Sequence, residues 1–190
     1  MDIKLLQKHL TNALSEGLGL DLTDPNLAET PTRIAKMWHN EFFSNCCSEF
    51  ADFKTFPNIH GYDQIVALDK IHFTSTCSHH FLPFTGLAWI FYIPADTLIG
   101  ASKMARIVEH YSHRPQLQEN LCHEVLKAII EGLDPRGAMV VMRAVHGCME
   151  CRGVKQYDGA GMATSAIYGM FVEPSIKAEA MGLLELSLKM

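Results

Sequence analysis

The sequence lacks any segment that would place the protein in or across a membrane. No stretch of its 190 residues approaches the roughly 20 consecutive apolar residues that span a bilayer. The N-terminal MDIKLLQKHL has no long apolar run of the kind that forms a signal peptide. Low-complexity tracts and internal repeats at solenoid periods are also missing. We therefore expect a cytoplasmic protein with no membrane contact, folded as one compact unit.

Concentrated charge of one sign is also lacking. Charged residues make up 19% of the chain, the net charge is −5 with neutral histidines, and no block of like charges occurs. Proteins that bind nucleic acids usually present a concentrated basic surface. We therefore expect no nucleic-acid partner, although this composition is compatible with a local basic pocket.

The chain contains six cysteines. In the reducing cytoplasm, cysteines serve as free thiols or metal ligands more often than as disulfides. Cys122 lies in a helical pattern, where a small thiol packs as a hydrophobe. Cys77 and Cys148 each neighbour histidines, and Cys151 lies beside the second of these clusters. We expect the Cys151 thiol to be inert, or to lie behind the side chains of these clusters that could bind a metal.

Hydrophobic periodicity divides the chain into short groups of helices and strands. Hydrophobic residues make up 48% of the sequence, which is enough for one core, and the length is too small for two comfortable domains. Thr30 followed by Pro31 predicts a helix N-cap and the first helical position. We expect an N-terminal helical segment over residues 1–45 and a main region over 46–190, together forming one α+β domain. Helices are predicted over residues 2–17, 29–43, 102–110, 118–132 and from about 175, and strands over 65–77, 86–94, 138–149 and 162–171.

Two clusters of cysteine and histidine fall at the ends of separate predicted strands. The first contains Cys77, His79 and His80, and the second contains His146 and Cys148. Thiolate and imidazole are ligands that zinc prefers, and a catalytic zinc site uses three protein ligands with a fourth position left open. Cys77, His80 and Cys148 would form such a site. On spacing alone, the alternative is that the cysteines are small buried hydrophobes and the histidines merely satisfy hydrogen bonds.

Pairs of basic residues three positions apart form a second constellation. Lys103 and Arg106 lie on one predicted helix, Arg33 and Lys36 lie on another, and Arg152 follows Cys148 closely. Two positive side chains on one helical face suit a polyphosphate ligand. The alternative is an ordinary solvated helix face.

Six segments together make the chain recognisable. The segments ETPTRIAKMWHNEFF, TSTCSHHFLPF, IGASKMARIV, RPQLQENL, AVHGCMECRG and MATSAIYGMF, in this order, resemble the successive signatures of GTP cyclohydrolase I. The resemblance covers about residues 3–171. It implies the tunnelling fold (T-fold), an antiparallel sheet with helices packed on one side, with 46–190 as the catalytic region. It also implies a ring-forming homo-oligomer, a decamer of two stacked pentamers with active sites between subunits.

The resemblance assigns roles to individual residues. It implies that Cys77, His80 and Cys148 bind Zn²⁺, and that His79 and His146 transfer protons. Residues implied around the substrate fall into three groups: Ser102, Lys103, Arg106 and Arg152 around the triphosphate and reacting ring, Gln118 and Glu119 at guanine, and Arg33 and Lys36 as phosphate contacts from a neighbouring subunit.

The implied reaction is zinc-dependent hydrolysis of GTP at guanine C8. Ring opening, formate release and rearrangement then give 7,8-dihydroneopterin triphosphate, at the start of pterin and tetrahydrofolate synthesis. Zinc lowers the pKa of water, and a histidine can protonate N7 to make C8 more electrophilic. A carboxylate at Glu119 can accept hydrogen bonds from both N1–H and the exocyclic amine of guanine, a pair of donors that adenine does not offer.

Two alternatives and one departure accompany this interpretation. The chain could be another T-fold enzyme acting on a pterin or a deazaguanine, or a non-catalytic ring protein in which zinc is structural. Histidines at 79 and 146 beside the ligands argue against a structural site, which has no need of proton transfer. Ser78 stands where the family commonly has a glutamate between the cysteine and the two histidines.

Overall fold

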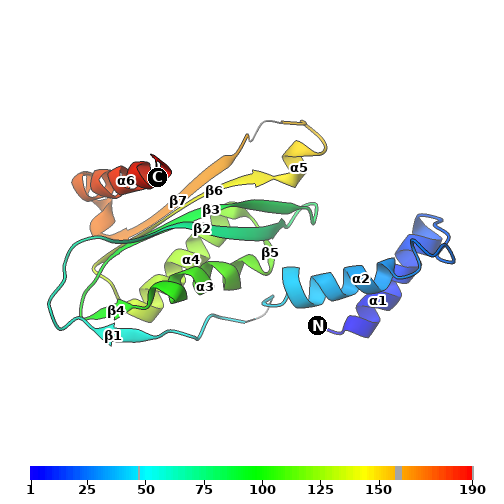
Figure 1. Ribbon diagram of the computed structural model, residues 1–190, viewed down its shortest axis with the longest axis horizontal. Helices are drawn as coiled ribbons and strands as arrows, with labels where there is room; N and C mark the ends of the chain where they lie inside the picture. Colours follow the sequence, from blue (N-terminus) through cyan, green and yellow to red (C-terminus); the bar gives the residue numbers. More distant parts are fainter. Residues whose placement is uncertain (47, 157–159, 190) are drawn as a thin grey trace.

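The structure is a computed structural model that describes residues 1–46, 48–156 and 160–189. Its N-terminal part is a helical hairpin that projects away from the sheet (Figure 1). Gln7 Nε2 donates to Thr32 Oγ1 at 2.8 Å and ties the two arms of the hairpin together. The hairpin consists of α1 (Ile3–Asn12), the π-helical turn η1 (Ala13–Gly17), α2 (Thr30–Met37) and the π-helical turn η2 (Trp38–Phe42).

A capping side chain marks the start of α1, and a proline in the first turn marks the start of α2. Asp2 Oδ1 accepts from the backbone N–H groups two and three residues further on, both at 3.0 Å, and so caps α1. Helix α2 begins at Thr30 with Glu29 as its N-cap, so the predicted cap at Thr30 is wrong by one residue. Pro31 is buried in the first turn, where its missing N–H costs no helical hydrogen bond.

The body of the chain is built on a five-stranded sheet. Thr76 pairs with Pro83, and Phe84 pairs with His146, so the three central strands bring their ends together at one end of the sheet. In sheet order the strands are β5 (Pro115–Gln116), β2 (Val66–Cys77), β3 (Pro83–Ile93), β6 (Gly137–His146) and β7 (Met162–Gly169). All neighbours are antiparallel except β5 and β2. A separate antiparallel ladder joins β1 (Thr55–Pro57) to β4 (Thr97–Ile99).

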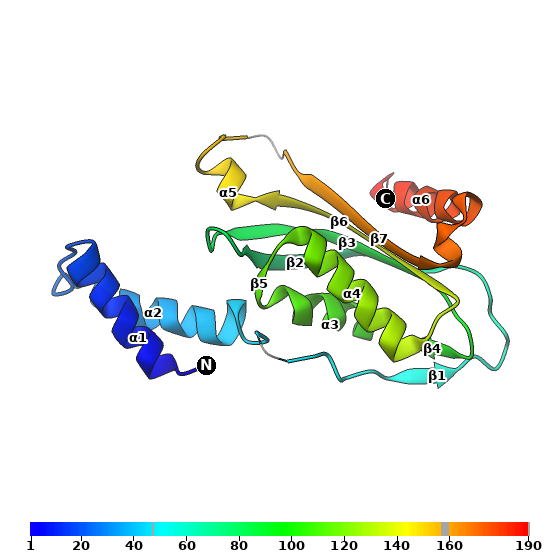
Figure 2. The same ribbon diagram turned by 180° about the vertical axis from the view of Figure 1, so that it is seen from behind.

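Helices cover both faces of the sheet. The covering helices are α3 (Ala101–Ser112), α4 (Gln118–Leu133) and α6 (Pro174–Lys189). Along β3, Ile90 and Tyr92 enter the core beneath α3 and α4, whereas Trp89 and Phe91 pack with α6. Figure 2 shows α3 and α4 across one face and α6 beyond the other. Trp89 Nε1 donates to Ser187 Oγ of α6 at 2.9 Å. The expectation of helices on one side only is therefore wrong for α6.

The two edges of the main sheet are largely uncovered. Strand β5 pairs with β2 only at Thr76 and Cys77, and further along β2 the register shifts between Leu68 and Ile71. Lys70, within this bulge, has a positive φ of 49°. Strand β7 forms the opposite edge and pairs with β6 alone among the described strands. Unpaired edges of this kind are templates for pairing with another chain.

No helix within the described residues combines the length and the apolar character that a membrane crossing requires.

Candidate metal centre and substrate site

The candidate metal centre forms where β2, β3 and β6 end together. Strand β2 ends at Cys77, and the chain turns through Phe81, which has a φ of 54°, before β3 begins. The backbone N–H of Cys77 donates to Leu82 O at 2.9 Å, and Phe81 N–H donates to Cys77 O at the same distance. On the other side, β6 is followed at once by the short helix α5 (Gly147–Glu150). Cys148 therefore lies in a helical turn two residues beyond the end of β6, so the predicted strand over 138–149 is three residues too long.

A glycine is required where α5 approaches β3. A Cβ added at Gly147 would lie 2.9 Å from Pro83 O, closer than real Cβ contacts allow. Because residue 147 has no side chain, the turn carrying Cys148 can sit directly against the start of β3. This close approach brings Cys148 to Cys77 across 71 residues of sequence.

The three predicted ligands come together. One ligand atom from each of Cys77, His80 and Cys148 lies within 4.8 Å of the others, and the two Sγ atoms are 3.9 Å apart. Two sulfurs bound to one tetrahedral zinc at about 2.3 Å each would be about 3.8 Å apart. The sulfur pair therefore fits zinc without rearrangement. Among the described residues, no second group of three such side chains is close enough to hold a metal.

The electrostatics of the cysteine pair favour a cation. Burial raises the pKa of the Cys148 thiol, and the hydrogen bond to Cys77 raises it further, while Arg152 acts in the opposite direction. Two thiolates 3.9 Å apart would repel each other in this half-buried setting. A divalent metal removes that repulsion, and its binding would be accompanied by release of thiol protons.

His146 is held next to the ligands by a buried hydrogen-bond network. Its ring stacks on Phe84 with 4.5 Å between centroids and 1° between planes, and its Nε2 is 2.8 Å from Gln118 Oε1. Gln118 is 1% exposed, and its Nε2 donates to Met142 O at 3.3 Å, Met162 O at 3.0 Å and Thr164 Oγ1 at 3.1 Å.

This network determines which nitrogen of the His146 ring carries the hydrogen. Since the amide nitrogen of Gln118 faces three acceptors, its oxygen faces the imidazole and requires a hydrogen on Nε2. Nδ1 is then the acceptor of the neutral ring. Burial lowers the pKa of His146, with Glu119 acting weakly in the opposite direction. The protein thus holds a neutral histidine ready to accept a proton.

Replacing Gln118 with leucine is expected to lower the free energy of unfolding by about 2–3 kcal/mol, because buried polar groups lose their partner. Chemical denaturation of the zinc-loaded protein measures this change. Gln156→Leu is the control, because Gln156 is exposed and its Nε2 donates to Val154 O, at 3.4 Å, within its own loop. Equal stabilities for the two variants would contradict the network.

Other predicted site residues also gather at this end of the molecule. His79 is exposed, with its ring centroid 6.2 Å from that of His80. Glu119, exposed in the first turn of α4, is close enough to His146 to raise its pKa. Arg152 follows α5 and is close enough to Cys148 to lower its pKa. The implied guanine contact at Gln118 stays a prediction, and the structure places that amide in the His146 network.

The basic residues of α3 lie away from the metal ligands. Ser102 and Lys103 are in its first turn, whereas Ser112 at its other end accepts a hydrogen bond from Ser75 Oγ at 2.8 Å, beside Cys77. Ten helical residues span about 15 Å. The Lys103 ammonium forms an ion pair with Asp52, and Arg106 Nη1 is 3.1 Å from the same carboxylate oxygen.

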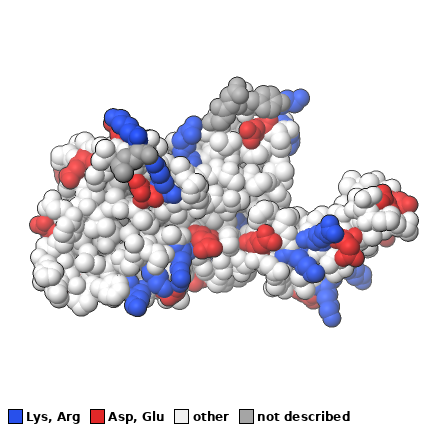
Figure 3. Space-filling model, in the orientation of Figure 1, with Lys and Arg blue, Asp and Glu red and all other residues white. Residues whose placement is uncertain are grey.

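Two further basic residues project from the hairpin. Arg33 and Lys36 are exposed on α2. At the C-terminal end of the hairpin, Trp38 and Phe43 pack on Phe81, in the turn between β2 and β3, with ring centroids 5.9 and 5.3 Å from that of Phe81. Figure 3 shows basic and acidic side chains interspersed over the face that it draws.

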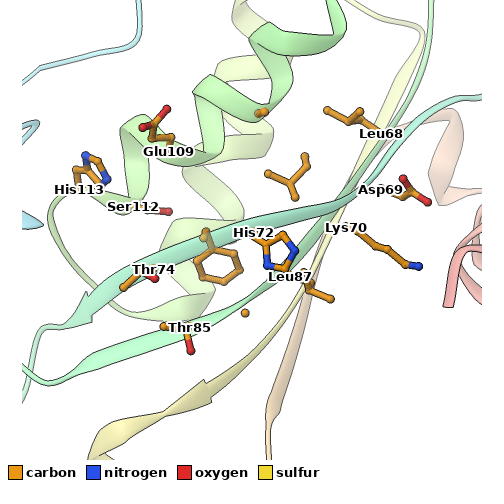
Figure 4. Close-up of a pocket in the computed structure, with 14 residues that line it drawn as sticks. Leu68, Asp69, Lys70, His72, Thr74, Thr85, Leu87, Glu109, Ser112 and His113 are labelled. Carbon is orange, nitrogen blue, oxygen red and sulfur yellow. The ribbon is translucent and has the colours of Figure 1, made fainter. Parts of the chain in front are cut away.

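A hollow of about 810 Å³ runs along the open edge of β2 rather than at the metal ligands. His72 and Thr74 line it from the strand, Glu109 lines it from α3, and His113 lines it from the C-cap of α3 (Figure 4). None of the three candidate metal ligands lines this hollow.

Sequence reasoning missed two contacts that shape these sites. Phe84 gave no signal beyond an apolar strand residue, yet it stacks on His146. Asp52 lies in an irregular segment 51 and 54 residues from the cations that it contacts. Neither contact has a local pattern that could have been recognised.

These features define a mixed α+β protein with a Cys₂His group that could hold a metal ion. Comparison with known proteins makes the assignment specific. The family model for GTP cyclohydrolase I matches residues 6–185. The chain belongs to the GTP cyclohydrolase I family, and the resemblance found in its six segments is confirmed.

Individual relatives support the same assignment. The chain is 40% identical over 180 residues to GTP cyclohydrolase 1 of Aeromonas salmonicida (strain A449), covering 91% of this chain and 80% of that protein. It is also 40% identical over 169 residues to GTP cyclohydrolase 1 of Streptomyces griseus, covering 88% and 83%. A solved structure of the archaeosine synthase QueF-Like in the apo form covers 56% of this chain and 94% of its own, with 19% identity and a TM-score of 0.46. That likeness is too weak to add to the assignment.

Proposed function

We propose that the protein hydrolyses GTP at guanine C8, opens the imidazole ring, releases formate and forms 7,8-dihydroneopterin triphosphate. The observation that carries this proposal is the Cys77, His80 and Cys148 cluster, with its 3.9 Å sulfur separation, beside a buried histidine in a chain of this family. Zinc bound by these three residues would supply Lewis acidity, which brings the pKa of water toward neutrality.

His146 and His79 divide the proton transfers. The Gln118 network holds His146 neutral with Nδ1 as its acceptor, so His146 takes up a proton as the ring opens. His79 is exposed beside the ligand His80 and can reach an incoming base. It donates a proton to N7, which makes C8 more electrophilic.

Glu119 reads the base. Its carboxylate projects from the first turn of α4, next to the buried Gln118 that holds His146. It accepts hydrogen bonds from guanine N1–H and the exocyclic amine, and adenine would leave this carboxylate without matching donors. The base is thereby oriented toward the histidines and the metal ligands.

A neighbouring subunit completes the site. The separation of about 15 Å along α3 between Ser102 and the metal end supports a triphosphate site formed by α3 of an adjacent chain. The uncovered edges of β2 and β7 support joining of sheets between subunits. We infer a closed ring, two of which stack as a decamer, with Arg33 and Lys36 of α2 as further phosphate contacts from a neighbour.

Incubation of the zinc-loaded protein with GTP is expected to yield 7,8-dihydroneopterin triphosphate and one equivalent of formate, both identified by mass spectrometry. ATP is the matched control, and we expect no ring opening because adenine lacks the two donors that Glu119 requires. Chelation of zinc should stop the reaction, and re-addition should restore it. A fully zinc-loaded, folded protein that releases no formate would refute the proposed function.

A further inference from the structure

Asp52 pairs with the two basic side chains of α3 that the family resemblance assigns to phosphate. Its Oδ2 accepts hydrogen bonds from both Lys103 and Arg106, the latter at 3.1 Å. An ammonium and a guanidinium that converge on one oxygen form the arrangement that binds phosphate. In this chain the oxygen belongs to the protein, so the two cations already have an anionic partner.

The chain on both sides of Asp52 is anchored. Phe53 packs so closely on Gly132 that an added Cβ there would lie 2.1 Å from its ring. Phe53 also meets Phe50 edge to face, with ring centroids 5.1 Å apart. Lys54 O accepts from the backbone N–H of Gly100, the N-cap of α3, at 3.2 Å. The carboxylate is therefore placed at the start of α3 by the fold.

The three side chains differ in how far they are exposed. The Lys103 side chain is 12% exposed, whereas those of Arg106 and Asp52 are 58% and 57% exposed. The hydrogen bond from Lys103, with a smaller effect of Arg106, holds the pKa of the Asp52 carboxyl below its usual range. The carboxylate is consequently ionised at neutral pH, and it can turn into solvent without moving its backbone.

We propose that Asp52 is an internal competitor of the substrate, whose carboxylate must leave Lys103 and Arg106 before a triphosphate can bind there. This inference rests on the proposed function, in that it takes these two cations to be the triphosphate contacts. The competing carboxylate lowers the apparent affinity for the polyphosphate chain and leaves recognition of the base unchanged. Asp52 thereby raises the substrate concentration at which the enzyme is half-saturated.

A structural role for Asp52 predicts the opposite effect. If the carboxylate served only to orient Lys103 and Arg106, its removal would loosen both cations and weaken anion binding. If it competes, its removal frees them and strengthens anion binding. The direction of the change in affinity therefore separates the two roles.

The test is calorimetric titration of the zinc-loaded full chain with inorganic tripolyphosphate. Asp52→Asn is expected to lower the Kd about threefold to tenfold, the range for losing exposed ion pairs to two cations. Asp52→Glu retains the competing charge and should stay within about twofold of wild type. Asp63→Asn is the matched control, because it removes one exposed carboxylate whose contact is the Gln64 amide at 2.7 Å.

Steady-state kinetics supply a second readout. In Asp52→Asn the KM for GTP should fall by the same factor as the tripolyphosphate Kd, with kcat and inhibition by guanosine unchanged. An affinity within about twofold of the Asp63→Asn control, or a weaker one, overturns the competitor role. If Asp52→Asn is unstable by thermal unfolding, Asp52→Ser is titrated in its place. Lack of GTP turnover by wild type would reject the proposed function, whereas the tripolyphosphate titration tests Asp52 in either case.

Discussion

Cys148→Ser is expected to lose zinc and activity together. Cys148 Sγ lies 3.9 Å from Cys77 Sγ, the separation that two sulfurs adopt on one zinc, and a hard hydroxyl is a poor replacement for a soft thiolate. Zinc affinity should fall about 10²-fold or more, and GTP turnover should fall with it. Metal analysis after dialysis and formate release measure the two quantities on the same sample.

Cys151→Ser is the control for this variant. Cys151 is three residues further along, is exposed, and its Sγ contacts Gly147 O at 2.9 Å instead of joining the ligand cluster. It should keep one zinc per chain and wild-type turnover. Stoichiometric zinc in Cys148→Ser, or equal losses in both variants, would remove Cys148 from the ligand set.

Two of the three candidate ligands could be predicted as a pair because their spacing is local, whereas Cys148 reaches them through the pairing of β3 with β6. Cys77 and His80 lie three residues apart at a strand end, and a turn of that length necessarily keeps them close. The His146 network could not be predicted in the same way. It depends on the β6–β7 register, which carries Met162 and Thr164 to Gln118 from 44 and 46 residues away. Periodicity within each strand does not specify such a register.

The fold shows the same division between local and distant information. The four long strands have enough β-branched and aromatic residues to be recognised, whereas β1, β4 and β5, of two or three residues each, are too short to show a period. Helix α6 was expected, but its place was not. Apolar residues occur on the exposed side of α6 as well, among them Leu183, Leu186 and Leu188. The sequence of the helix therefore does not indicate that Ala180 and Leu184 form its buried face.

The basic residues of α3 show what a family resemblance can predict and what it cannot. It assigned Lys103 and Arg106 to phosphate, which stays a prediction, and the structure shows both side chains paired with one carboxylate. The anion itself, Asp52, lies outside the six recognised segments. The pairing of Lys103 and Arg106 with Asp52 therefore could not be predicted from these segments, and only the structure reveals it.

His79→Ala is expected to retain zinc and to lower GTP turnover by about 10²-fold or more, the usual cost of removing a general acid. His79 is adjacent to His80 in sequence but is not one of the three residues whose ligand atoms come together. Its loss should therefore leave those three residues in place. Zinc content and kcat, measured together, separate this role from that of a ligand.

Two additions make the test of His79 specific to proton transfer. His60→Ala, in an exposed turn before β2, is the matched histidine control and should behave as wild type. Added imidazole should restore part of the turnover of His79→Ala, because a small acid can enter the space that the side chain leaves, and it should do nothing for Cys148→Ser. If His79→Ala instead loses its zinc, the ligand set is wrong. If it keeps full activity, the proton that reaches N7 must come from a group other than His79.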